Sequence, residues 1–112
     1  MCNMYKKLLC GVSACGGKAQ GIVQIVSSEK DFASFKKCCV LVVSETNPSF
    51  TLLMLKAVAV VTEYGGVCSH AAIVSREIGV PCIVGAENAT RLLKNGQKVF
   101  LDADEGVVYS VD

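Results

Sequence analysis

The chain contains one histidine, His70, and the residues around it are suited to binding an anion. The glycine pair Gly65 and Gly66 lets backbone N–H groups come close to a ligand, because no Cβ atom obstructs them. A helix beginning after Ser69 would add its free N–H groups and the positive end of its dipole at the same place. A neutral imidazole there keeps a nitrogen lone pair that can attack phosphorus. On the residues alone, a single histidine at a helix start is more often a capping residue than a nucleophile, so both interpretations stay open.

Seven cysteines, at positions 2, 10, 15, 38, 39, 68 and 82, are the other reactive groups. Their number is odd and no two have a C-x-x-C spacing, so we expect reduced thiols rather than a disulfide framework. Cys68, His70 and Cys82 could be combined into a metal site, but their spacing matches no recognised set of ligands. We therefore expect no metal in this chain.

Composition and charge exclude several classes of function. Hydrophobic residues make up 52% of the chain and charged residues 19%, which suits a buried core and argues against disorder. The net charge is +1 and the basic residues form no stripe, so no nucleic-acid partner is expected. No apolar run approaches the roughly 20 residues of a membrane span. The run 8–12 after two lysines is shorter than the roughly 7–15 apolar residues of a lipoprotein signal. We expect a cytoplasmic protein that does not enter membranes.

The hydrophobic pattern predicts short strands that alternate with short helices. Strands are expected, from β-branched and continuous apolar residues, at 8–13, 21–27, 39–43, 57–62, 82–84, 99–102 and 107–111. Helices are expected, from apolar spacing and start signals, at 28–37, 50–56, 70–78 and 88–93, the last capped by Asn88. The 112 residues fit one domain, in which residues 1–7 are a candidate for disorder.

The predicted elements place His70 at the start of a helix. A buried strand leads into the glycine loop, Ser69 stands at the N-cap position, and Gly79 is suited to end the helix. His70 would then lie in the first turn, beside the free N–H groups.

A longer motif surrounds His70. Residues 61–85 read VTEYGGVCSHAAIVSREIGVPCIVG, residues 46–48 read TNP after a buried strand, and residues 93–109 form the expected hairpin region. Together with Gly11, Gly17 and Gly21 near the beginning, these segments resemble one known family along nearly the whole chain. The family is the mobile, swivelling domain of phosphoenolpyruvate-utilising enzymes, which include phosphoenolpyruvate synthase, pyruvate phosphate dikinase and enzyme I of the sugar phosphotransferase system.

The resemblance implies an α/β fold, the swivelling β/β/α phosphohistidine domain. It also implies that His70 accepts a phosphoryl group on Nε2 from phosphoenolpyruvate or ATP and passes it to pyruvate or another acceptor. The donors would be bound by an ATP-grasp nucleotide-binding domain or a phosphoenolpyruvate/pyruvate-binding barrel domain, in trans or on a parent chain. Mg²⁺ and ATP or phosphoenolpyruvate are expected on those partner domains, and no cofactor is expected in this one.

The resemblance also implies roles for residues near His70. Gly65 and Gly66 would shape the phosphate loop, and Ser69 would cap the helix or bind the phosphoryl oxygens. Thr46 and Arg76 also suit purely structural roles. The candidate phosphate-binding residues are Gly65, Gly66, Ser69, Cys68, Arg76 and Thr46.

The chain departs from the family in two segments. Cys68 stands where the family usually has threonine, so a hydroxyl contact to phosphate is lost and regulatory phosphorylation at that position is excluded. Cys15 and Gly16 stand where it usually has Ser-Pro, which should loosen that loop. The family's nucleotide-binding and barrel domains do not fit into 112 residues, so we expect no complete reaction cycle from this chain. The alternative is a non-catalytic module that keeps the fold and binds a partner or an anion without accepting phosphate.

Overall fold

The computed structural model describes residues 5–111, in which eight strands pair into one sheet. The strands are β1 (Tyr5–Cys10), β2 (Val12–Cys15), β3 (Lys18–Ile25), β4 (Cys39–Val43), β5 (Ala59–Thr62), β6 (Cys82–Val84), β7 (Lys98–Asp102) and β8 (Val107–Val111). Their order across the sheet is β1-β8-β7-β3-β4-β5-β6-β2. The run from β3 to β6 is parallel, and the remaining pairs are antiparallel.

The two edge strands of the sheet, β1 and β2, follow one another in the chain and are separated only by Gly11. The Gly11 N–H donates to the carbonyl of Gly106 at 2.8 Å. A Cβ atom at Gly11 would lie 2.6 Å from the carbonyl oxygen of Val84, so only glycine allows this close approach. The sheet therefore curls until its two ends meet at one bend of the chain.

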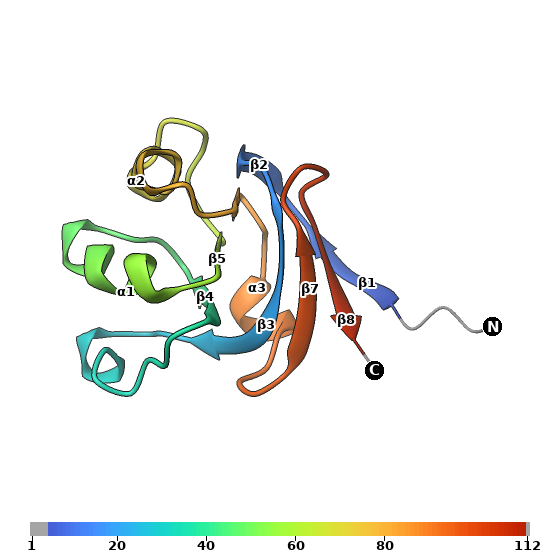
Figure 1. Cartoon of the computed structure of the whole chain (residues 1–112), viewed down its shortest axis with the longest axis horizontal. Helices are drawn as coiled ribbons and strands as arrows, with labels where there is room; N and C mark the ends of the chain where they lie inside the picture. The colour runs from blue at the N-terminus through green and yellow to red at the C-terminus, as the bar shows by residue number, and fades with distance from the viewer. Residues whose placement is uncertain (1–4, 112) are drawn as a thin grey trace.

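The helices α1 (Thr51–Lys56) and α2 (His70–Ile78) cover one face of the parallel strands, as Figure 1 shows. The short helix α3 (Ala89–Leu92) and the antiparallel strands lie on the other face. One core cluster, with Leu41, Met54 and Val60, lies under α1 and α2. The other, with Val42 and Leu101, fills the space between the two parts of the sheet. These layers confirm the predicted α/β class and its β/β/α arrangement.

The strand β4 explains why its sequence is a continuous apolar run. All five of its residues are buried, because the central parallel strands have a core cluster on each face. The same holds for β5 and β6, where every residue is buried as well. The carboxyl ends of β4 and β5 open into loops, and both loops contribute to the site around His70.

Several expected elements differ in the structure. The strand predicted at 8–13 is broken at Gly11, and β3 runs over Lys18–Ile25 rather than 21–27. The helix predicted at 28–37 is wrong: only one 3₁₀ turn, Glu29–Asp31, forms. The Asp31 carboxylate accepts the Ser27 N–H at 2.9 Å and closes a tight loop there. Residues 5–7 belong to β1, whereas residues 1–4 of the expected disordered end lie outside the described part.

Asn88 lies at the N-cap position of the last helix, as expected, but it does not cap the helix with its side chain. Asn88 has a left-handed backbone (φ 64°), and its side chain makes no capping hydrogen bond. The helix α3 is only Ala89–Leu92, and it packs on β4 and β1. Within residues 5–111, no helix has the length and apolar character needed to cross a membrane.

Candidate active site

The helix α2 begins at His70, as the sequence predicts. Ser69 is its N-cap, with extended backbone and a side-chain oxygen that accepts the Ala72 N–H at 3.4 Å. Gly79, in the left-handed region (φ 75°), ends the helix and donates to the Ser75 carbonyl. The first N–H groups of a helix have no acceptor within it, so the start of α2 offers donors and the positive dipole end to an anion. His70 itself is half-buried there.

The His70 ring is held by Thr46, which lies in the loop after β4. The Thr46 hydroxyl oxygen and His70 Nδ1 are 2.7 Å apart. The next residue, Asn47, accepts the Ser49 N–H at 2.9 Å and starts the 3₁₀ turn Pro48–Phe50, so this loop has a defined shape. Within residues 5–111, Nε2 of His70 has no hydrogen-bond partner. The Thr46 side chain therefore contacts the Nδ1 side of the imidazole ring and leaves the Nε2 side open.

The glycine loop before His70 turns back onto the helix start. Gly65 has φ 106°, and a Cβ atom there would lie 2.9 Å from Cβ of Ser69. Both the backbone angle and the space therefore require glycine. The Ser69 N–H donates to the Gly66 carbonyl at 3.0 Å, which closes the turn. A Cβ atom at Gly66 would meet nothing within 4 Å, so the loop is open on that side.

Arg76 is used to hold this loop. Its Nη2 donates to the Val67 carbonyl at 2.7 Å, and its Nη1 donates to the Ala14 carbonyl at 3.1 Å. The guanidinium therefore ties the segment before His70 to strand β2. Cys68 lies in the same loop and is exposed.

Cys82, unlike Cys68, is buried. It is fully buried in β6 under α2, with its Sγ 4.0 Å from the Ala71 carbonyl, and burial raises the pKa of its thiol to about 11. The cysteines at positions 10, 15, 38, 39, 68 and 82 are free thiols. Cys2 lies outside the described residues. Between residues 5 and 111, the side chains of His, Cys, Asp and Glu form no group of three that could hold a metal ion.

Sequence reasoning missed Glu63, a nearly buried carboxylate at the end of β5. It is 9% exposed. Its Oε1 accepts the Ser44 hydroxyl at 3.0 Å, and its Oε2 accepts the Thr90 N–H at 2.8 Å and the Thr90 hydroxyl at 2.7 Å. Burial alone would raise the pKa of Glu63, but these hydrogen bonds outweigh it and hold the pKa below 4.5. The sequence does offer one signal for Glu63, because it is an acidic residue between a buried strand and the glycine loop.

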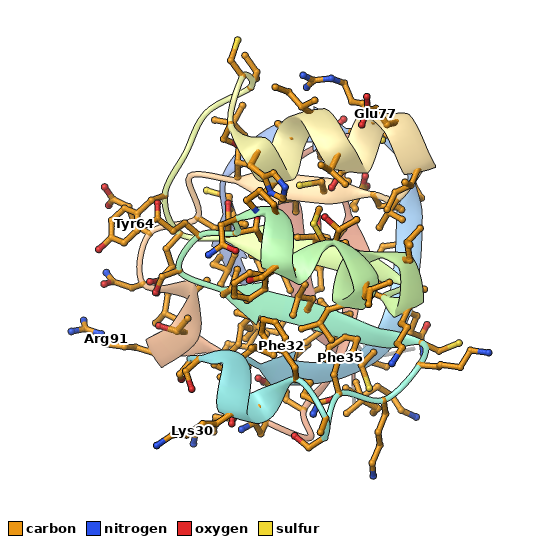
Figure 2. The ribbon with its side chains drawn as sticks, turned by 90° about the vertical axis from the view of Figure 1, so that its left-hand side faces the viewer. Lys30, Phe32, Phe35, Tyr64, Glu77 and Arg91 are labelled. Carbon is orange, nitrogen blue, oxygen red and sulfur yellow. The ribbon has the colours of Figure 1, made fainter. Side chains whose placement is uncertain are left out.

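Several large apolar side chains are exposed on α2, on the loop before it and on α1. Tyr64 is 63% exposed, and Figure 2 shows it projecting outward from its loop. Val67 in the same loop and Ile73 on α2 are also exposed, and α1, which contacts α2, carries exposed Leu52 and Leu55. Large apolar side chains exposed in one region are typical of a surface that another protein or domain covers.

The β/β/α layers, with a histidine at a helix start after a glycine loop, define the class of mobile domains expected from the sequence. Residues 35–106 match the family described as PEP-utilising enzyme, mobile domain. The chain belongs to this family.

Curated relatives show the same relationship. The chain is 44% identical over 104 residues to a probable phosphoenolpyruvate synthase of Archaeoglobus fulgidus, covering 93% of this chain and 14% of the relative. It is 46% identical over 106 residues to a probable phosphoenolpyruvate synthase of Staphylothermus marinus, covering 93% of this chain and 13% of the relative. The chain thus spans only a small part of the length of these relatives.

A solved structure of Enzyme I is also similar. Its sequence is 32% identical to this chain, with a TM-score of 0.56, over 64% of this chain and 30% of that one. This structural similarity supports the family assignment independently of the sequence-family match.

Proposed function

We propose that this chain is a phosphocarrier in which His70 accepts a phosphoryl group on Nε2. The observation that carries the proposal is the 2.7 Å contact between the Thr46 hydroxyl and His70 Nδ1. When the hydroxyl oxygen accepts the Nδ1 proton, the lone pair of the neutral ring is on Nε2. That nitrogen has no partner within residues 5–111, so it is free to attack. Membership of the PEP-utilising family supports phosphoenolpyruvate or ATP as the donor.

The chemistry needs a nucleophile and a place for three phosphoryl oxygens. The Nε2 lone pair forms the N–P bond while the P–O bond of the donor breaks, and the electron pair leaves with the donor oxygen. The transferred oxygens would meet the free N–H groups at the start of α2, including those of His70 and Ala71. The open side of the loop at Gly66 leaves room for them. Ser69 supports this arrangement as the cap of α2, through its bond to the Ala72 N–H.

The donor and acceptor sites belong to partners in this proposal. An ATP-grasp domain would supply ATP and Mg²⁺, and a barrel domain would supply phosphoenolpyruvate or accept the group on pyruvate. The exposed apolar side chains on α1, on α2 and on the loop before α2 support contact with such domains. A cytoplasmic location, where these metabolites occur, is part of the same proposal. The isolated chain is then expected to turn over neither ATP nor pyruvate, because it lacks the proximity that a donor site provides.

The test is phosphorylation of the purified chain by a phosphoenolpyruvate- or ATP-dependent partner. We expect one phosphoryl group that is labile in acid and stable in base, because an N–P bond hydrolyses once its nitrogen is protonated. His70→Ala should remove this label. Equal labelling of wild type and His70→Ala would refute the proposal, and an absence of label on folded wild type would favour the non-catalytic binding module.

A further inference from the structure

We propose that Glu63 is a positioning residue for His70, an inference that rests on the proposed phosphocarrier function. Glu63 directly follows β5, and Tyr64 alone separates it from Gly65. Its carboxylate does not contact His70 in the structure. It acts through the loop after β4, which carries Thr46 and therefore sets the orientation of the imidazole ring.

The carboxylate joins two loops that are distant in sequence. On one side, Oε1 accepts the hydroxyl of Ser44, the residue that follows β4. On the other side, Oε2 accepts both the N–H and the hydroxyl of Thr90, near the start of α3. The group is 9% exposed, so water has little access to replace these bonds. Glu63 thus fixes the loop after β4 against the first turn of the short helix α3.

The backbone strengthens the same connection. The Tyr64 N–H donates to the Ser44 carbonyl at 2.9 Å, and the Glu63 N–H donates to it at 3.1 Å. Ser44 is therefore held by its side chain and its carbonyl, only two residues before Thr46. A shift of Ser44 would move the Thr46 hydroxyl away from His70 Nδ1, because the intervening chain is too short to absorb it.

A glutamate at position 63 suits the joining of these two loops better than a glutamine or an alanine would. An ionised carboxylate only accepts hydrogen bonds, and all three side-chain contacts of Glu63 come from donors. Glutamine can keep Thr90 on its amide oxygen and donate its NH₂ to Ser44, whose hydroxyl can turn to accept. Glu63→Gln should therefore retain most of the geometry, whereas Glu63→Ala removes all of it.

The experiment compares Glu63→Ala, Glu63→Gln and Val108→Ala. Val108 is fully buried in β8, in the core cluster between the two parts of the sheet, so its variant controls for loss of stability alone. Two measurements are made on each folded protein: the ¹⁵N NMR signals of the His70 ring, and the rate of phosphorylation by phosphoramidate. In that reaction Nε2 forms the bond to phosphorus, the P–N bond of phosphoramidate breaks, and ammonia leaves, so no partner protein is needed.

We expect Glu63→Ala to lower the phosphorylation rate by roughly two- to tenfold, at most the effect of losing the one hydrogen bond between Thr46 and the nucleophile. Its His70 ring signals should shift toward the Nε2–H tautomer, and Glu63→Gln should restore both readouts. Val108→Ala should match wild type in both. Ser44→Ala removes only the hydrogen bond from the Ser44 hydroxyl to Glu63 Oε1. It should shift the ring signals and lower the rate in the same direction as Glu63→Ala. It replaces Glu63→Ala in the test if that variant does not fold.

The proposal is overturned if Glu63→Ala, or Ser44→Ala in its place, keeps wild-type ring signals and a wild-type rate. Equal changes in Val108→Ala at matched stability would also overturn it, because Glu63 would then act only on the fold. Failure of wild type to accept phosphate would refute the phosphocarrier function instead. In that case the ring signals still decide whether Glu63 orients His70.

Discussion

Thr46→Val removes the hydroxyl that contacts the His70 ring and keeps a side chain of similar shape. In the structure this hydroxyl is 2.7 Å from Nδ1, and both residues are half-buried. Without it, the ring loses the partner that favours the Nδ1–H tautomer and leaves the lone pair on Nε2. We therefore expect Thr46→Val to phosphorylate more slowly while it remains folded.

The size of the effect follows from the strength of one hydrogen bond. Such a bond contributes about 0.5–1.5 kcal/mol net. Each 1.36 kcal/mol corresponds to about a tenfold change in rate. The expected loss is therefore roughly two- to tenfold, with the lower end favoured because water can reach a half-buried ring and replace part of the bond.

The assay is the initial rate of phosphorylation of His70 by phosphoramidate, followed by mass spectrometry at constant pH. Thr46→Ser is the matched control, because it restores the hydroxyl and should restore the rate. A Thr46→Val rate equal to wild type would refute the role of this contact. A Thr46→Ser rate as low as that of Thr46→Val would show that the methyl group matters and not the hydroxyl.

Other features of the site lead to further expected outcomes. Gly65→Ala should lose about 1–3 kcal/mol of unfolding free energy in denaturant titrations, because it combines a left-handed φ of 106° with a clash against Ser69. Gly66→Ala should unfold like wild type, and an equal loss in both would contradict the geometry. The lowered pKa of Glu63 means that its contribution to stability is present above pH 4.5 and is lost as the pH falls through the folded-state pKa. Melting temperatures from pH 3 to 7 should therefore fall more steeply below pH 4.5 in wild type than in Glu63→Gln, and parallel curves would contradict this. Limiting iodoacetamide should modify exposed Cys68 well before buried Cys82, and alkylation of Cys68 should block phosphorylation of His70. Peptide mass spectrometry measures both modifications. Normal phosphorylation of the protein alkylated at Cys68 would contradict the second expectation.

The sequence predicted elements well where a single local rule decides the structure. The helix over 70–78 was predicted at both ends, because a serine cap and a glycine in the left-handed region each act locally. The strands at 39–43 and 82–84 were predicted from continuous apolar runs. The final hairpin was also predicted, since Gly106 (φ 72°) suits its tight turn.

The failures occurred where tertiary contacts override local patterns. Phe32 and Phe35 have helical spacing, but they enter the core from a tight loop, and the Phe32 ring packs edge-on against Phe50 with 4.9 Å between centroids. Figure 2 shows both rings under α1, pointing into the body of the protein. Within the site, the Thr46 contact to His70 spans 24 residues and the Glu63 contact to Thr90 spans 27. No spacing rule relates residues so far apart, so only the folded chain reveals these contacts.

The pairing of β1 with β8 has a mechanical consequence. Tyr5 lies opposite Val111, so the described chain enters and leaves the fold at one place, while α1 and α2 lie at the opposite side of the molecule (Figure 1). In a longer chain, two linkers joined here would act as a double tether at a single corner. A body held in this way turns about its attachment as a lever arm, with His70 far from the pivot. A small change of angle at the tether would then carry the imidazole a long way while its ring remains held by Thr46.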